Sequence, residues 1–415
     1  TRQPKDRCHH CRFLQRARHC FTVCGGEVMV APKLRFKEFD GDLTESKLVE
    51  LTSWASGGTP AKDVPEYWGD DIPLISGASM HTNQLYESDV KITKLGLQKG
   101  SKLAPKDSIL ILVRGSMLFN KIPMGITLGD VAFNQDVKCI RPKQQLAPLF
   151  LFQWLHAKEN TIQNKVTATG IGAGKLDTAD LQNLKLYKPS LEEQTKIATF
   201  LSAVDEKISQ LTQKHQLLRE YKQGMMQKLF SQQVRFKADD GSEFGEWGNS
   251  YIGDVCKITT GNKDTQNKVD DGEYPFFVRS QTVERINSYS MDCEAVLTSG
   301  DGVGVGKNYH YIDGKFDFHQ RVYCLFDFSE NILGKYLYIY FSSYFYDRVK
   351  RLSAKNSVDS VRMDMISKME IQLPCLEEQT KIANFLSSID QKIEVVGQQI
   401  EQAKQWKKGL LQQMF

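Results

Sequence analysis

The sequence contains an internal repeat, and this repeat constrains the fold more than any other feature. The 42 residues that begin at Pro189 align without gaps with the 42 residues from Pro374 to Phe415, and 20 of these positions are identical. Residues 133–140 (FNQDVKCI) match residues 318–325 (FHQRVYCL) at the same offset of 185. We interpret the chain as a tandem duplication in which each copy joins a divergent globular unit to a well-preserved terminal segment.

The repeat also predicts the domain boundaries. Residues 34–37 match residues 234–237, and Gly57 aligns with Gly261. We therefore expect a leader at 1–28, a first target-binding domain at 29–188, a central helix at 189–231, a second domain at 232–373 and a C-terminal helix at 374–415.

Each terminal segment is predicted to form one long helix. Pro189 and Pro374 end the extended chain that precedes the two segments. Ser190 with Glu193 fits the pattern of a capping box, whereas Cys375 replaces the serine in the second copy. Apolar residues then recur with the period of a coiled coil. The expected coiled-coil interface consists of Ile197, Leu201, Val204, Ile208, Leu211, Leu218, Ile382, Leu386, Ile389, Ile393, Val396 and Ile400.

Two apolar seams of equal length in one chain need a partner, and each seam is the nearest partner for the other. Because a globular unit returns the chain between them, we expect an antiparallel pair of helices with approximate two-fold symmetry. The alternative is that each helix is amphipathic and packs only on its own globular unit.

The globular units are predicted to be α/β, each with a strongly bent sheet or a partial barrel. Strand-like runs occupy residues 108–114, 131–140, 320–326 and 369–374. Helical patterns follow at residues 146–166 and 332–352.

The charge of the chain is concentrated in its first residues. The net charge is +4, and residues 1–28 account for all of this excess. The remaining body is neutral, so nucleic-acid binding must depend on local patches. Cys8, Cys11, Cys20 and Cys24 have spacings that could hold zinc, but this stretch lacks helical or strand periodicity. We therefore expect a disordered or non-native leader.

The remaining cysteines and the hydropathy point to a reducing, aqueous location. Five cysteines lie among apolar neighbours, and we interpret them as buried free thiols of a cytoplasmic protein. These are Cys139, Cys256, Cys293, Cys324 and Cys375. No apolar run approaches the length of about 20 residues that a membrane-spanning helix needs.

The motifs that would indicate catalysis fail their tests. A Walker A loop requires a glycine five residues before its Gly-Lys pair, but Thr169 stands there for Gly174-Lys175 and Asp301 for Gly306-Lys307. Asp136 and Lys138 resemble the D-x-K end of a metal-dependent nuclease strand, but the repeat places Arg321 at the position of the carboxylate. We therefore expect no catalytic residue and no metal site.

What remains is binding through polar and glycine-rich loops. Arg and Lys can read guanine edges in the major groove of DNA, and Asn and Gln can read adenine. For any single residue the alternative is an ordinary solvated side chain, so the loops are stronger candidates than their individual members. The candidates are Gly57, Gly58, Thr59, Lys62, Ser76, Arg114, Lys121, Asn134, Gln135, Lys175, Lys257, Lys263, Arg279, Gln281, Lys307, Asn308, His319, Arg321, Lys355 and Asn356.

Taken together, these features resemble the specificity (S) subunit of type I restriction–modification systems, over residues 34–415. The strongest carriers are the paired LEEQTKIA segments after Pro189 and Pro374. GGTP…PEYWGDDIPLIS at residues 57–76 is similar to the opening of many target-recognition domains of this family, and GIGAGKLDTADLQNLKLYKP from Gly170 resembles their closing segment. The second domain departs from the pattern, because it lacks the GGTP motif.

The resemblance implies two target-recognition domains that each read one half of a bipartite DNA sequence. It implies helices that set the separation of the half-sites and dock two modification subunits. These partners would methylate adenine with S-adenosylmethionine, and restriction subunits would join them with ATP and magnesium. No catalysis and no cofactor is implied for this chain itself. The alternative function is a coiled-coil adaptor that does not bind DNA.

Overall fold

The chain forms two compact units, which a computed structural model describes over most of their length. The first unit comprises Thr1–Gln213 with Gly397–Phe415, and the second comprises Lys214–Val396. The residues described are 21–23, 32–170, 172–302, 304–352 and 360–415.

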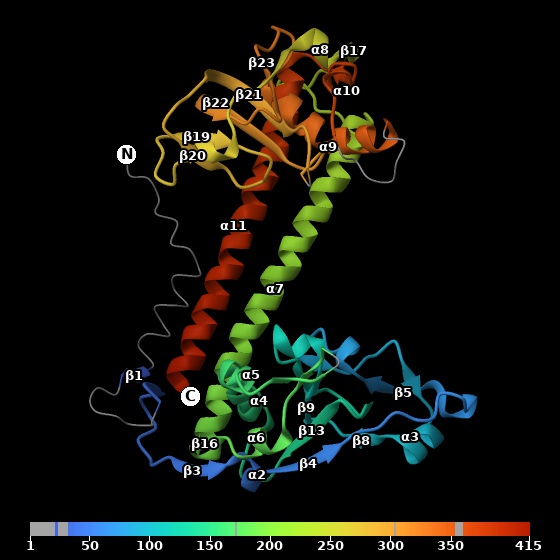
Figure 1. Ribbon diagram of the computed structural model, residues 1–415, viewed down its shortest axis with the longest axis vertical. Coiled ribbons are helices and arrows are strands. Elements are labelled where there is room, and N and C mark those ends of the chain that lie inside the picture. The colour runs from blue at the N-terminus through green and yellow to red at the C-terminus, as the bar shows by residue number, and fades with distance from the viewer. Residues whose placement is uncertain (1–20, 24–31, 171, 303, 353–359) are drawn as a thin grey trace. The chain divides into compact units, whose positions relative to one another are not determined.

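Each unit contains one mixed α/β region and one half of each of two long helices (Figure 1). The helices are α7 (Leu191–Phe230) and α11 (Leu376–Met414). The predicted fold class, a duplicated α/β region with two long helices in contact, is confirmed.

Two sheets and the buried helix α4 (Pro148–Ala157) form the core of the first unit. The larger sheet has the strand order β4-β13-β9-β11-β6, and the smaller has β7-β5-β12-β8. All four residues of β9 are buried and belong to one cluster with Phe150 and Trp154 of α4. The strands are β4 Thr52–Ser56, β5 Trp68–Ile75, β6 Gln84–Leu85, β7 Lys91–Ile92, β8 Lys102–Ala104, β9 Ile109–Leu112, β11 Met124–Thr127, β12 Val131–Phe133 and β13 Val137–Pro142.

Shorter elements complete the first unit at its edges. A three-stranded sheet has the order β10-β15-β14, and strands β3 and β16 form a pair. Strand β1 (Phe21–Val23) pairs antiparallel with β2 (Leu34–Phe36). The other elements are β3 Thr44–Lys47, α2 Leu48–Leu51, α3 Lys94–Gly100, β10 Arg114–Gly115, α5 Glu159–Gln163, β14 Thr167–Ala168, β15 Gly174–Lys175, α6 Thr178–Gln182 and β16 Lys185–Lys188.

A six-stranded sheet covered by α9 (Gly334–Leu352) forms the core of the second unit (Figure 1). Its strand order is β18-β23-β21-β22-β19-β20. Tyr336, Phe341 and Phe345 of α9 are fully buried in a cluster with Val296 of β21 and Leu325 of β23. The elements are β17 Gly248–Tyr251, α8 Ile252–Val255, β18 Lys257–Thr260, β19 Tyr274–Phe277, β20 Glu284–Ile286, β21 Met291–Ser299, β22 Tyr309–Phe318, β23 Val322–Phe326, α10 Met363–Ser367 and β24 Glu370–Leu373.

The strand predicted at residues 131–140 is broken in its middle. β12 ends at Phe133 and β13 begins at Val137, and the two strands belong to different sheets. Asn134 makes the turn, because its Oδ1 accepts the backbone N–H of Asp136 at 3.1 Å. Short polar side chains favour such turns by replacing a backbone acceptor. The prediction of one continuous strand was therefore wrong, and the break creates a tight polar loop.

The two long helices contact each other within both units. In the first unit, Leu201 and Val204 of α7 share an apolar cluster with Leu410 and Met414 of α11. In the second unit, the C-terminal end of α7 shares a cluster with the N-terminal half of α11. The N-terminal half of one helix thus meets the C-terminal half of the other, which is an antiparallel arrangement.

Ion pairs between the helices follow the repeat. Asp205 accepts from the Lys407 ammonium at 2.6 Å in the first unit. Asp390 accepts from Lys222 at 2.6 Å in the second. The two pairs are related by the offset of the repeat, so each lysine that interrupts an apolar seam has a carboxylate on the opposite helix.

A buried glutamate at the start of each helix joins it to the segment that precedes its globular region. Glu193 is almost fully buried and accepts two bonds from Arg35, at 2.8 and 2.7 Å. Glu378 is fully buried and accepts from Arg235 at 3.1 and 2.7 Å, and from the indole of Trp247. A bidentate arginine–carboxylate pair is strong and directional. These pairs explain why residues 34–37 and 234–237 match.

The predicted capping box of α7 forms only in part. The backbone N–H of Glu193 donates to Ser190 Oγ at 3.3 Å, as expected. The Glu193 carboxylate bonds to Arg35 rather than returning to the cap residue. The next residue, Gln194, holds the end of the globular region instead, because its amide bonds to the backbone of Gln145, Ala147 and Pro189. Gln379 does the same in the second unit.

The cysteines differ from the prediction at two positions. Cys139, Cys256 and Cys324 are buried free thiols, and burial raises the pKa of Cys256 to about 12. Cys293 is half-buried and Cys375 is exposed. Cys375 is exposed because it immediately precedes α11, where its repeat partner Ser190 caps α7. The four leader cysteines lie outside the described residues.

We predict that Arg35→Ala destabilises the first unit by about 3 kcal/mol, because it leaves the buried Glu193 carboxylate without a partner. Arg35→Ala combined with Glu193→Gln should recover part of this loss, since no unpaired charge remains buried. Urea unfolding monitored by circular dichroism measures both. The control is Lys404→Ala, which removes an exposed pair with Glu401 and should cost less than about 1 kcal/mol. Equal losses for Arg35→Ala and the control would contradict the prediction.

Candidate nucleic-acid interface

Two glycines bring one loop of the first unit against the turn at Asn134. The amide of Gly58 donates to Phe133 O at 3.0 Å. A Cβ on Gly57 would lie 2.0 Å from the same oxygen. Only glycine allows this approach. In the second unit a Cβ on Gly261 would lie 2.0 Å from Phe318 O, so the predicted alignment of Gly57 with Gly261 is confirmed.

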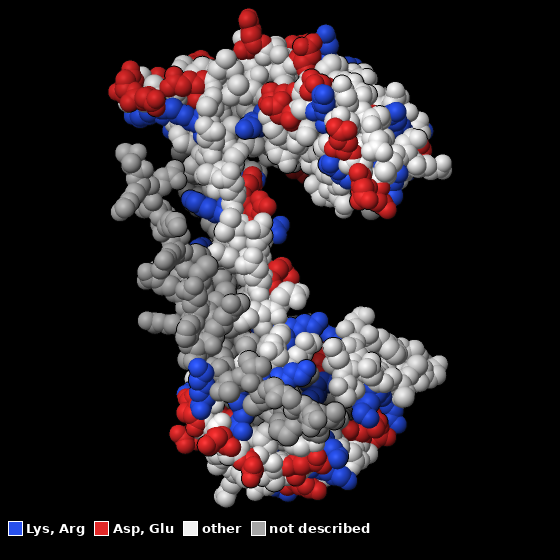
Figure 2. All heavy atoms as spheres, turned by 90° about the vertical axis from the view of Figure 1, so that its left-hand side faces the viewer, with Lys and Arg blue, Asp and Glu red and all other residues white. Residues whose placement is uncertain are grey.

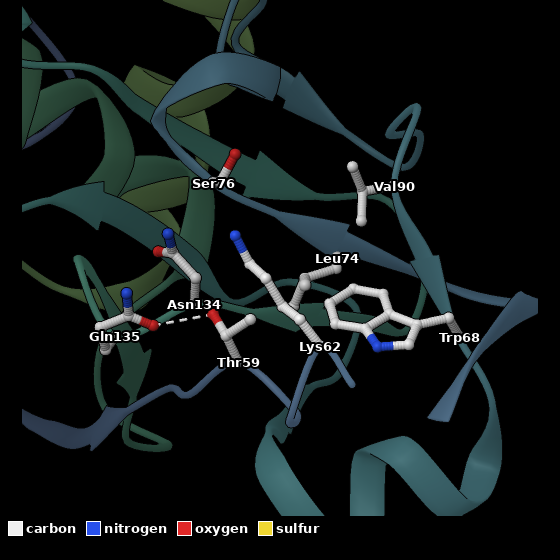
Figure 3. A pocket seen from close by; sticks show the side chains of 8 residues that line it. All are labelled: Thr59, Lys62, Trp68, Leu74, Ser76, Val90, Asn134 and Gln135. Carbon is white, nitrogen blue, oxygen red and sulfur yellow. Dashed lines mark hydrogen bonds between the residues drawn. The ribbon is translucent and has the colours of Figure 1, made fainter. Parts of the chain in front are cut away.

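In the first unit, the glycine loop and the turn at Asn134 border an open pocket of 590 Å³ (Figure 3). Five predicted residues line it, and the prediction missed three apolar ones. The indole of Trp68 donates to Ala61 O at 3.0 Å, which holds its ring at the pocket wall. The predicted residues are Thr59, Lys62, Ser76, Asn134 and Gln135, and the missed ones are Trp68, Leu74 and Val90.

A basic pair lies beside the same turn. Arg114 of β10 is the register partner of Lys175 of β15, and both side chains are exposed. The backbone N–H of Val113 donates to Asp136 O at 2.8 Å, which joins the start of β10 to the turn. Two adjacent cations beside a polar turn suit the binding of phosphate groups. Lys121 is exposed but does not line the pocket.

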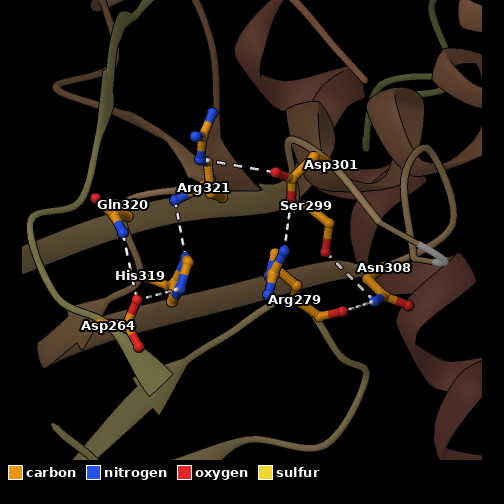
Figure 4. A network of polar contacts seen from close by, with 8 residues as sticks. All are labelled: Asp264, Arg279, Ser299, Asp301, Asn308, His319, Gln320 and Arg321. Atoms are coloured by element: carbon orange, nitrogen blue, oxygen red, sulfur yellow. Dashed lines mark hydrogen bonds and ion pairs between the residues drawn. The ribbon is translucent and has the colours of Figure 1, made fainter. Parts of the chain in front are cut away.

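The second unit repeats the turn with different side chains (Figure 4). His319 stands at the position of Asn134, and its Nδ1 accepts the backbone N–H of Arg321 at 2.9 Å. Burial lowers the pKa of His319, as does the nearby Arg279 cation, so the imidazole is neutral at pH 7. The neutral ring therefore carries its proton on Nε2.

One carboxylate in this network holds two arginines. Asp301 lies 3.0 Å from Arg279 and 3.7 Å from Arg321. The Asn308 amide donates to Arg279 O at 3.1 Å and to Ser299 Oγ at 3.3 Å. Asp301 occupies the backbone position in the second unit that Arg114 occupies in the first. Asp301 forms an antiparallel β-bridge with Ser360, just as Arg114 pairs antiparallel with Lys175.

The other candidates of the second unit are less concentrated. Lys263 lies 3.8 Å from the buried Asp317. Lys257 pairs with Asp327 on the neighbouring chain segment, and the Lys307 ammonium lies over the ring of Tyr346. Gln281 is exposed. Lys355 and Asn356 lie outside the described residues.

Most of the expected interface residues of the helices are buried. Ile208, Leu218 and Ile393 are half-buried, whereas the others are buried. Ile197, Leu201 and Val204 lie in the core cluster of the first unit, and Ile382, Leu386 and Ile389 in that of the second.

Basic and acidic side chains are intermingled on the face shown in Figure 2. The mixed surface agrees with the neutral charge of the body. Phosphate groups would therefore be attracted only by local cations such as Arg114 and Lys175. Among the described residues, no group of three or more His, Cys, Asp or Glu side chains converges as metal ligands. No helix in the described part of the chain is long and apolar enough to cross a membrane.

The fold and the duplicated loops define a protein with two copies of one recognition domain. A family model described as "Type I restriction modification DNA specificity domain" matches residues 41–219 and again residues 245–405. The chain belongs to this family: it is a DNA specificity subunit of a type I restriction–modification system, the part that is not catalytic. This membership contradicts the alternative of an adaptor that does not bind DNA.

Curated relatives match either most of the chain or a little under half of it. The MjaVIII specificity subunit of Methanocaldococcus jannaschii is 27% identical over 413 residues, which cover 91% of this chain and 94% of the relative. The EcoR124I/EcoR124II specificity subunit of Escherichia coli is 29% identical over 182 residues, which cover 43% of this chain and 45% of the relative.

Solved structures share the fold. The S subunit of a type I restriction–modification system from M. genitalium has a TM-score of 0.64 at 15% identity, covering 93% of this chain and 99% of its own. A chain from a structure concerned with complex assembly and conformational transition of the type I system has a TM-score of 0.53 at 16% identity, covering 91% and 98%.

We predict that Gly57→Ala destabilises the first unit by about 2 kcal/mol and weakens specific DNA binding, because the added methyl group would collide with Phe133 O. The matched control is Gly129→Ala, where no atom lies within 4 Å of the added Cβ. Urea unfolding and fluorescence anisotropy with a labelled target duplex measure the two effects. If Gly57→Ala unfolds at the same midpoint as the control, the close approach does not constrain the loop.

Proposed function

We propose that each globular region reads one half of an asymmetric, bipartite DNA target through its turn and the glycine loop against it. One observation carries the proposal. The same backbone turn is built in both units, with Asn134, Gln135 and Asp136 in the first and His319, Gln320 and Arg321 in the second. A constant scaffold with different polar side chains suits two readers of different base sequences.

The surrounding residues divide by chemistry. The amides and arginines of the turns suit hydrogen bonds to base edges in the major groove, whereas Arg114, Lys121, Lys175, Lys257, Lys263 and Lys307 suit contacts to phosphates. Asp301 supports hydrogen bonding to base edges in the second unit, because it orients Arg279 and Arg321 before DNA is bound. Preorganised arginines lose less conformational entropy when they bind guanine.

The paired helices, in this proposal, fix the separation of the two half-sites and dock the modification subunits. The repeat supports two equivalent docking surfaces, because the ion pairs Asp205–Lys407 and Lys222–Asp390 recur at equivalent positions. Assembly into a type I complex is the subject of one related structure. S-adenosylmethionine, ATP and magnesium then belong to partner subunits that act on DNA in the cytoplasm.

The independence of the two domains can be tested by exchange. Residues 236–370 are replaced by the corresponding segment of another family member, and methylated adenines are mapped by single-molecule sequencing in cells that also express the modification subunit. We expect one half of the methylated motif to change and the other half to stay. A change in both halves would contradict independent reading.

The phosphate contacts can be tested by salt dependence. Arg114→Ala and Lys175→Ala should each reduce the slope of log binding constant against log salt concentration by about 1, on target and unrelated duplexes alike. The control is Lys185→Gln, whose exposed lysine pairs with Glu45 and is not among the proposed DNA contacts. Unchanged slopes for both first-unit variants would exclude this basic pair from the DNA contact.

A further inference from the structure

Two glutamines occupy equivalent positions at the centre of the two turns. Gln135 and Gln320 are exposed, and each is followed within two residues by the strand that continues the sheet. A side chain from the opposing glycine loop holds each amide, Thr59 in the first unit and Asp264 in the second. Thr59 contacts the carbonyl end of its glutamine and Asp264 contacts the amino end, so different ends of the two amides remain free.

Asp264 offers only acceptors to Gln320. Its Oδ2 accepts from Gln320 Nε2 at 3.3 Å (Figure 4). An ionised carboxylate has no proton to donate, so the amide of Gln320 must turn its nitrogen toward Asp264. The carbonyl oxygen Oε1 of Gln320 is then the end that faces away from Asp264.

The carboxylate of Asp264 is itself fixed by a short turn. Its Oδ1 accepts the backbone N–H of Gln266 at 3.3 Å, and its own N–H donates to Asn267 Oδ1 at 2.8 Å. This reciprocal capping leaves Oδ2 for Gln320. The Nε2 atom of His319 lies 3.8 Å from the same oxygen, which is beyond hydrogen-bonding distance.

The first unit has the opposite arrangement. Thr59 Oγ1 donates to Gln135 Oε1 at 2.8 Å (Figure 3). This bond occupies the carbonyl end of the amide and leaves both N–H groups of Nε2 available at the border of the pocket. The backbone bond of the adjacent Gly58 to Phe133 O holds the loop that carries Thr59.

We propose that Thr59 and Asp264 are positioning residues that orient the two glutamines oppositely, so that the two domains read opposite kinds of base edge. This inference rests on the proposed DNA contact of the turns and deepens it. Gln135 presents N–H donors, which suit the major-groove acceptors of guanine or thymine. Gln320 presents a carbonyl acceptor, which suits the amino group of adenine or cytosine.

The test uses the full chain in complex with its modification subunits and a pool of randomised double-stranded DNA, from which bound duplexes are selected and sequenced. Asp264→Asn keeps a capping side chain but can both donate and accept, so Gln320 can adopt either orientation. We expect the preference between amino-bearing and keto-bearing bases to fall about tenfold at one position of one half-site only.

Thr59→Val removes the hydroxyl donor with little change of shape and should relax one position of the other half-site. Thr59→Ser keeps the hydroxyl and should retain the original preference, which a merely structural role of the threonine methyl group would not predict. Circular dichroism confirms that each variant is folded. Gln135→Ala and Gln320→Ala serve as references that remove the reading groups themselves.

Two results would overturn the inference, and they are distinguishable. If Asp264→Asn and Thr59→Val keep the original motif while both glutamine-to-alanine variants relax it, the glutamines read DNA but these residues do not orient them. If the glutamine-to-alanine variants also keep motif and affinity, the turns do not contact bases, and the proposed interface fails with the inference.

Discussion

The structure depends on a buried carboxylate at the start of each long helix. Glu193 and Glu378 lie where solvent cannot stabilise them, so each requires an arginine from the segment that enters its globular region. The adjacent glutamines, Gln194 and Gln379, bond to the backbone that precedes α4 and α9. Each helix is thereby joined to its globular region by side chains of two neighbouring residues. The direction in which a globular region presents its turn is consequently tied to the helix on which it stands.

The sequence predicts what the repeat and local periodicity encode. Both long helices and the α/β class follow from patterns that recur within short windows. The match between residues 34–37 and 234–237 is visible in the sequence. The Arg35–Glu193 ion pair that explains it joins residues far apart in the chain, so the sequence alone does not reveal it. The break at Asn134 was missed because apolar runs on both sides suggest one strand. The polar triplet at 134–136 was the available signal.

The candidate site was predicted better as loops than as residues. Thr59, Lys62, Ser76, Asn134 and Gln135 converge on one pocket although they come from separate segments. Trp68, Leu74 and Val90 were missed because apolar residues in strand-like runs normally indicate core. In the second unit, the carboxylates of Asp264 and Asp301 organise the network, and a search for DNA-binding groups does not select acids. Their role becomes visible only when their distances to Gln320, Arg279 and Arg321 are known.

If Arg279 and Arg321 contact DNA as proposed, the shared carboxylate of Asp301 has a consequence for how the protein searches a genome. Arg279 and Arg321 already have an internal counter-ion, so a phosphate backbone that offers nothing else must compete with Asp301 for them. In the proposed interface, non-specific duplex would therefore gain less from these arginines than from free ones, which would shorten its residence time. Because non-specific sites vastly outnumber targets, rapid release from them shortens the search as effectively as tight binding at the target.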